Sequence, residues 1–226
     1  MKDQVVVLAV TKMLSGMCAG GVSLTTGEWV RPVKEFGTIL PGDLTYADGS
    51  PIRPFDVVEF SLGKHRPKPP HVEDWTCDFV RERPALVRRL SEPERREFMD
   101  SSAEPDAMEA INSSQRSLCL LPSQEAQALF VLDSYSGKYD ARIYFPALGQ
   151  RAAPVTDVKW RALGRRLTAD SNRVVLRGKQ LLETVHTERV YPAVGLSRLH
   201  EGQFWPLVIG VHCLPDYEAE VDYKSL

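Results

Sequence analysis

The chain has 226 residues, of which 43% are hydrophobic and 26% are charged, and its formal net charge is −2. This composition excludes a disordered chain, which would contain far fewer apolar residues and carry a larger net charge. The small net charge also excludes a general electrostatic attraction to nucleic acid or membranes, so any such attraction must be local.

The cysteines indicate the compartment. Cys18, Cys77, Cys119 and Cys213 lie far apart, and none belongs to the C-x-x-C pair that is typical of zinc and redox sites. No stretch approaches the roughly 20 apolar residues that a membrane-spanning helix needs. We therefore expect a cytoplasmic protein with free thiols, with no metal or other cofactor and with no membrane partner.

Residues 1–80 have the pattern of antiparallel strands. A dense β-branched run at residues 4–10 predicts a buried strand. Thr25-Thr26-Gly27-Glu28 stands between apolar residues and predicts a hairpin turn, and Pro32 is expected to end the second strand of that hairpin. Residues 55–62 alternate in polarity, which predicts a further strand.

Residues 81–116 differ, because charges are dense there and strand-forming residues are scarce. Ser91-Glu92-Pro93-Glu94 is a capping box with proline in the first turn, which predicts a helix beginning near Ser91. A second short helix is expected at residues 104–111. We interpret residues 81–116 as a helical insertion, or bridge, between two β-rich parts of the chain.

Residues 117–226 return to strand patterns. A first strand is expected at 117–123, and a hairpin at 128–149 with its turn at Ser136-Gly137. Residues 155–167 are expected to begin as the end of a strand and to continue as a helix. Glu201-Gly202 predicts the turn before the final strand.

Antiparallel strands joined by turns rich in glycine and proline favour sandwiches or barrels over a parallel α/β sheet. The predicted fold class is therefore mainly β, a β-rich α+β fold. Residues 1–80 and 117–226 would each form a barrel-like domain, and residues 81–116 would connect them.

Several phrases, in order along nearly the whole chain, resemble the bacterial dual OB-containing domain family. The most distinctive phrase places a tryptophan between a glycine turn and an Arg-Pro pair. The phrases are CAGGVSLTTGEWVRPV (18–33), FDVVEF (55–60), HVEDW (71–75), RIYFPALG with VTDVKW (142–149 and 155–160), and AVGLSRLHEGQFWPLVIGV (193–211). The resemblance implies two tandem OB-like barrels that bind nucleic acid or nucleotides, often in defence-related settings.

OB barrels bind single strands by stacking bases on aromatic side chains while cations follow the phosphates. Residues 151–180 contain eight cations and two carboxylates, so a local charge of +6 stands within a chain of −2. These features favour a non-catalytic module that binds single-stranded RNA or DNA. The candidate binding residues are Trp29, Arg31, Lys64, His71, Trp75, Arg142, Tyr144, Lys159, Trp160 and Arg161.

Structural interpretations of the same residues stay open. Trp29 and Trp205 also fit anchors of a core or a hairpin. Arg31 also fits an ion pair that holds a loop. Residues 151–180 also fit a solvated helix face that the acidic residues 216–222 balance.

Three other functions also stay open. The first is a sensor that binds a small nucleotide or a modified base in the cleft between the barrels. The second is a metal-dependent enzyme that processes nucleic acid through the His71–Asp74 cluster, although one histidine beside two carboxylates is a weak metal-site pattern. The third is an interaction protein that works beside an effector protein, for which the mixed charge of residues 84–116 is the support.

Overall fold

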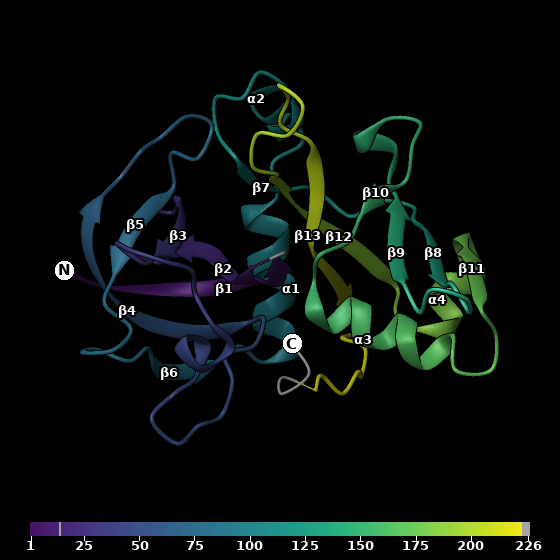
Figure 1. Ribbon diagram of the computed structural model, residues 1–226, viewed down its shortest axis with the longest axis horizontal. Helices are drawn as coiled ribbons and strands as arrows, with labels where there is room; N and C mark the ends of the chain where they lie inside the picture. The colour runs from purple at the N-terminus through teal and green to yellow at the C-terminus, as the bar shows by residue number, and fades with distance from the viewer. Residues whose placement is uncertain (14, 223–226) are drawn as a thin grey trace.

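The computed structural model describes residues 1–13 and 15–222. The chain folds into two β-rich halves that lie side by side, with helix α1 (Glu92–Ser102) between them (Figure 1). The fold is mainly β with OB-like barrels, as the sequence predicts. Within the described residues, none of the helices has both the length and the apolar character needed to cross a membrane.

The first half is built on one six-stranded sheet, with the order β1-β2-β3-β5-β4-β6. Strand β1 also pairs with β4, which closes five of the strands into a barrel. Strands β3 and β5 pair in parallel, and the other pairs are antiparallel. The strands are β1 (Lys2–Met13), β2 (Gly16–Ser23), β3 (Trp29–Val33), β4 (Asp56–His65), β5 (Asp74–Cys77) and β6 (Ala85–Arg89). A short 3-10 helix, η1 (Pro41–Leu44), lies between β3 and β4.

Strand β1 is apolar along both faces because both faces are buried. Side chains two residues apart in a strand point to the same side. Val5 and Val7 accordingly pack inside the barrel, whereas Val6 and Leu8 pack against the second half of the molecule. The β-branched run at residues 4–10 is therefore a strand with two apolar contacts, and the prediction of a buried strand there is confirmed.

The predicted hairpin between β2 and β3 is also confirmed, but its second strand is longer than expected. Gly27 adopts a φ of 73°, a conformation that favours glycine. Pro32 does not end β3, because Arg31–Val33 pair in parallel with β5. The pairing with β2 covers only Trp29 and Val30, so the missing N–H of Pro32 leaves no gap on that side.

The segment predicted as a helical bridge begins with a strand. Residues 85–89 form β6, which pairs with β4 at the edge of the first sheet with its side chains exposed. Helix α1 then begins after Ser91 as predicted. The Glu94 carboxylate accepts hydrogen bonds from the backbone N–H and the hydroxyl of Ser91, each at 2.7 Å. The second predicted helix is α2 (Ala107–Asn112).

The second half contains two sheets, with the orders β10-β9-β8-β11 and β13-β12-β7. A parallel bridge between Val155 and Val208 links them. One apolar core lies between these sheets and two helices, α3 (Val158–Leu167) and α4 (Gly178–Thr184). The strands are β7 (Leu118–Leu120), β8 (Gln127–Leu132), β9 (Tyr139–Tyr144), β10 (Ala153–Pro154), β11 (Arg173–Arg177), β12 (Arg189–Leu196) and β13 (Pro206–Leu214), and a 3-10 helix, η2 (Pro146–Leu148), follows β9.

The two halves are joined by apolar packing and by buried polar contacts. A shared cluster includes residues from β1, β2, α1, β7, β12 and β13. Glu73, which is 6% exposed, accepts hydrogen bonds from the backbone N–H groups of Ser117 and Leu118 at 2.7 and 3.0 Å. The N–H of Lys12 on β1 donates to the carbonyl of Thr156, just before α3, at 3.2 Å. The relative position of the halves is therefore fixed by the fold.

Candidate functional site

A groove runs between the two halves and consists of two adjoining clefts of about 760 and 530 Å³. The first cleft lies between the β1–β2 hairpin and the β12–β13 hairpin. The second lies between β3, residues 68–71 and the loop that connects β12 to β13. Cys18, Arg31 and Arg198 line both clefts, so we treat the two as one site, the inter-barrel groove.

The inter-barrel groove is strongly basic. Six cations line it, whereas Asp74 is the one carboxylate among the described lining residues. The cations are Lys12 and Arg161 in the first cleft, Lys34 and Lys68 in the second, and Arg31 and Arg198 at the junction. This concentration of positive charge gives an otherwise slightly acidic chain a local site for an anion.

Some of these cations already have protein partners. Arg31 Nε lies 2.6 Å from Asp74 Oδ1, and Lys34 Nζ lies 2.6 Å from a carboxylate oxygen of Asp43. Arg161 donates to a backbone carbonyl at 3.2 Å and lies over the Tyr139 ring. Three others, Lys12, Lys68 and Arg198, have no ion-pair partner within the described part of the chain. Their charges are therefore available to a bound anion.

The loop at residues 197–205, between β12 and β13, supplies the aromatic wall of the groove. The Trp205 side chain lines the first cleft, and the residue is 47% exposed. Its backbone N–H donates to the Ser197 hydroxyl at 2.9 Å, and its indole N–H donates to the His200 carbonyl at 3.4 Å. Phe204 lines the second cleft, where its ring centroid lies 6.0 Å from that of His71. A bound molecule can therefore contact an indole without displacing the core.

Two titratable side chains in the groove carry no charge at neutral pH. Burial raises the pKa of the Cys18 thiol above its ordinary value. Burial, followed by the nearby Arg31, lowers the pKa of His71 to about 4. Cys18 is therefore a protonated thiol and not an activated nucleophile, and His71 adds no positive charge to that of the lysines and arginines.

Three residues predicted from the sequence to bind a ligand line the groove. Arg31 lies at the junction, Arg161 in the first cleft and His71 in the second. Arg31 also forms the ion pair with Asp74 that the sequence left open as its structural interpretation.

Five other predicted residues lie on other surfaces. Lys64 is exposed near the end of β4, and the Trp75 ring stacks on His65 with centroids 4.5 Å apart. Arg142 pairs with Asp140 at 2.8 Å on β9, which also carries Tyr144. Lys159 pairs with Asp216 at 2.7 Å and lies over the Tyr217 ring. The structure does not bring these side chains together with the groove.

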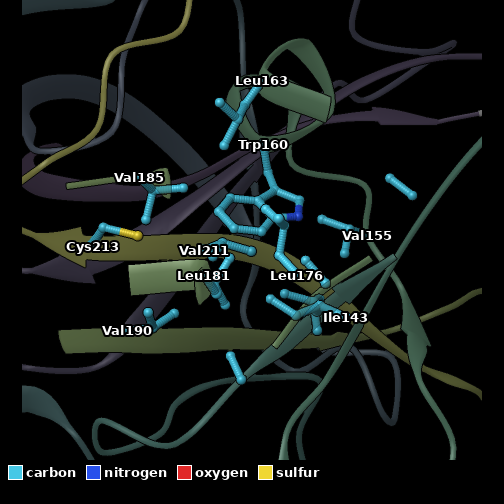
Figure 2. Packing of buried hydrophobic residues seen from close by; sticks show 14 of the residues in the cluster. Ile143, Val155, Trp160, Leu163, Leu176, Leu181, Val185, Val190, Val211 and Cys213 are labelled. Atoms are coloured by element: carbon cyan, nitrogen blue, oxygen red, sulfur yellow. The ribbon is translucent and has the colours of Figure 1, made fainter. Parts of the chain in front are cut away.

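Two predicted tryptophans belong to the core, which corrects their proposed stacking role. Trp160 is fully buried and lies among Val155, Leu163 and Leu176 in the second half (Figure 2). Trp29 is 8% exposed and packs between the halves. A base cannot stack on either ring without opening the core. Trp29 is therefore a core anchor, which is the structural role that the sequence analysis also considered for it.

Cations of the basic stretch at residues 151–180 have different contacts. Arg161 is the only one of its cations among the described lining residues of the groove. Lys159 is paired with Asp216, Arg165 lies over the Tyr139 ring, and Lys179 pairs with Glu183 along α4. The groove therefore contains one of the eight cations of this stretch.

The His71–Asp74 cluster is divided among different contacts. Glu73 points into the contact between the halves, Asp74 pairs with Arg31, and His71 packs against Phe204. Among the described residues, no group of three or more His, Cys, Asp and Glu side chains is placed to hold a metal ion. The hypothesis of a metal-dependent enzyme therefore loses the cluster on which it depended.

Sequence reasoning did not select the groove cations Lys12, Lys34, Lys68 and Arg198, and it considered Trp205 only as an anchor of a core or a hairpin. Their position in the sequence could have indicated a binding role for Arg198 and Trp205. These two residues stand near the two ends of a hairpin loop, next to strands of the shared core. Loops at the ends of a rigid β scaffold commonly carry binding residues.

A family model described as a dual OB-containing domain matches residues 3–211 of the chain. No curated protein and no solved structure matches it. The matched range contains every described residue that lines the inter-barrel groove.

Proposed function

The chain belongs to the dual OB-containing domain family, and we propose that it binds single-stranded nucleic acid in the inter-barrel groove. The observation that carries this proposal is the combination of six lining cations, one lining carboxylate and a half-exposed indole. Cations neutralise phosphates, and an aromatic face accepts an unstacked base.

A single strand fits these features better than a duplex. Stacking on Trp205 requires a base whose face is free of its neighbour, which single strands offer and duplexes do not. Among the described residues, Arg161 is the only one of the eight cations at residues 151–180 that lines the groove, which favours a short contact over a long one that follows the backbone. We expect contacts to a few phosphates and to one or two bases.

Fluorescence anisotropy with labelled RNA and DNA oligonucleotides tests the proposal. For about three phosphate contacts, the logarithm of the affinity should fall with the logarithm of salt concentration with a slope of about −2. Raising salt from about 50 to 200 mM should then weaken binding by roughly twentyfold. Arg198→Ala should weaken binding and make this slope shallower by about 0.7.

Arg173→Ala is the matched control, because Arg173 is an exposed cation on β11 that does not line the groove. This variant should bind like the wild type. If the wild type does not bind single strands, or if Arg173→Ala weakens binding as much as Arg198→Ala, the groove is not the nucleic-acid site.

A sensor for a free nucleotide or modified base is the second candidate function. The first cleft, at about 760 Å³, falls within the roughly 300–1,000 Å³ typical of small-molecule sites. A thermal-shift screen with mononucleotides separates the two functions. Stabilisation by one mononucleotide, with no binding of longer strands, would favour the sensor.

The chemistry of the groove residues needs no catalytic step. Their contacts support binding through charge and stacking, with the thiol of Cys18 kept protonated by burial. We also place the protein in the cytoplasm, because all four cysteines are free thiols.

A further inference from the structure

We propose that the first cleft holds one base of the bound strand, turned away from the line of the backbone, while the second cleft holds the adjacent phosphates. This inference rests on the proposed function and adds which part of the ligand each cleft contacts. It follows from the different linings of the two clefts.

The first cleft has an apolar lining to which both halves contribute. Ala9 on β1 and Leu118 on β7 contribute to it, together with Leu207 and Ile209 on β13. The second cleft is polar by comparison, since Lys34, Lys68, Thr38, His71 and Asp74 line it. Transfer of the apolar faces of a planar base from water into an apolar cleft is favourable, whereas transfer of a charged phosphate is unfavourable. The base therefore belongs in the first cleft.

Two glycines, Gly20 and Gly195, line the first cleft. A Cβ atom at Gly20 would lie 3.4 Å from Leu118 Cδ1, which is ordinary contact, so packing alone does not require glycine there. A Cβ at Gly195 would lie 2.9 Å from Ile209 Cγ2, so Gly195 is needed for packing between β12 and β13. Gly20 is thus a lining position where the first carbon of an added side chain meets ordinary contacts and a larger side chain would take up space in the cleft.

The cations are arranged for a base between phosphates. Arg31 and Arg198 stand at the junction of the clefts, and Lys12 and Arg161 line the first cleft together with its apolar residues. Trp205 lines the same cleft with its indole half exposed. A base that enters the first cleft can stack on the indole while its two flanking phosphates meet arginine and lysine.

Filling the cleft tests the inference. The probes are a fluorescein-labelled RNA of eight uridines and a labelled octamer of the same backbone without bases. Gly20→Val should weaken binding of the uridine octamer by about fivefold to hundredfold, the range for loss of one stacked base, and should leave binding of the abasic chain unchanged. Arg198→Ala should weaken binding of both, because its contact is to phosphate.

A second measurement uses the wild-type protein, in case Gly20→Val does not fold. An abasic octamer that carries one uridine should bind at least about fivefold more tightly than the fully abasic octamer, because that single base can enter the first cleft. A single uridine that adds no affinity would overturn the inference.

The outcomes also separate this inference from the proposed function. If a folded Gly20→Val binds the uridine octamer like the wild type while Arg198→Ala does not, the groove binds phosphates without a base in the first cleft. If the wild type binds neither octamer, the proposed function itself is wrong.

Discussion

Replacing Glu73 tests how the two halves are joined. Its carboxylate is buried and accepts three hydrogen bonds from β7 and the residue before it: the N–H of Ser117, the N–H of Leu118 and the hydroxyl of Ser117, at 2.7, 3.0 and 2.8 Å. Ser117 is itself 0% exposed, so water cannot replace a lost acceptor there.

Glu73→Ala should therefore lower the free energy of unfolding substantially. Two backbone N–H donors are left buried without an acceptor, and each costs about 1–3 kcal/mol. We expect a loss of about 4 kcal/mol, which is a large share of the roughly 5–15 kcal/mol stability of an ordinary domain. The Ser117 hydroxyl adds less, because it can rotate toward another acceptor.

Glu73→Gln is the matched control. Its amide oxygen can accept from both N–H groups as the carboxylate oxygen does, and its amide NH₂ can donate to the Ser117 hydroxyl. The expected loss is below about 1 kcal/mol. Urea unfolding of the three proteins, followed by tryptophan fluorescence and by circular dichroism, measures both losses. An alanine variant that loses less than about 1 kcal/mol, or a glutamine variant that loses as much as the alanine variant, would refute the reasoning.

Three other substitutions test the fold. His212 is buried and its pKa is lowered to about 4, mainly by burial, against about 6.5 in the unfolded chain. Between those two pH values only the unfolded chain takes up this proton. The free energy of unfolding should therefore fall by up to about 3 kcal/mol as the pH drops from about 6.5 to 4. In urea unfolding, His212→Gln should lack this pH-dependent decrease. A methyl group at Gly21 would overlap a backbone carbonyl oxygen of β1, so Gly21→Ala should lower the melting temperature by several degrees, while Gly42→Ala, which meets open space, should not. Tyr217→Ala should lower the free energy of unfolding in urea by about 3–5 kcal/mol, because the ring is buried against the core of the second half. Tyr135 is fully exposed, so Tyr135→Ala should change the free energy of unfolding by no more than about 0.5 kcal/mol. Equal losses in either pair, or equal pH dependence with and without His212, would contradict these assignments.

The strands and helices that local signals specify could be predicted from the sequence. The β-branched run of β1, the glycine turn at Gly27 and the capping box at Ser91 each depend on a few neighbouring residues, and each is present in the structure. Strand β6 could not be predicted in this way. Its residues include Arg88 and Arg89, and it exists because β4 offers an open edge far away in sequence.

The candidate site was harder to predict, because the sequence does not say which side of an element faces the core. Trp160 and Arg161 are neighbours on α3, yet the first is fully buried in the core of the second half and the second lines the groove. Arg198 lies in a loop whose partner surface is the other half of the molecule. Only the packing of the halves determines that these side chains share a groove with Arg31.

The positive charge of the groove depends more on the position of the carboxylates in the fold than on an excess of lysine and arginine over aspartate and glutamate in the sequence. Several carboxylates are buried and bound to other parts of the protein: Asp3 accepts from two hydroxyl groups, Asp56 from a tyrosine hydroxyl, and Glu73 and Asp157 from backbone N–H groups of β7 and β13. Structural roles thus withdraw negative charge from the surface and leave Asp74 as the one carboxylate among the described residues of the groove. A chain with a net charge of −2 can therefore present a strongly basic cleft, which is why the charge of a segment such as residues 151–180 does not locate a binding surface.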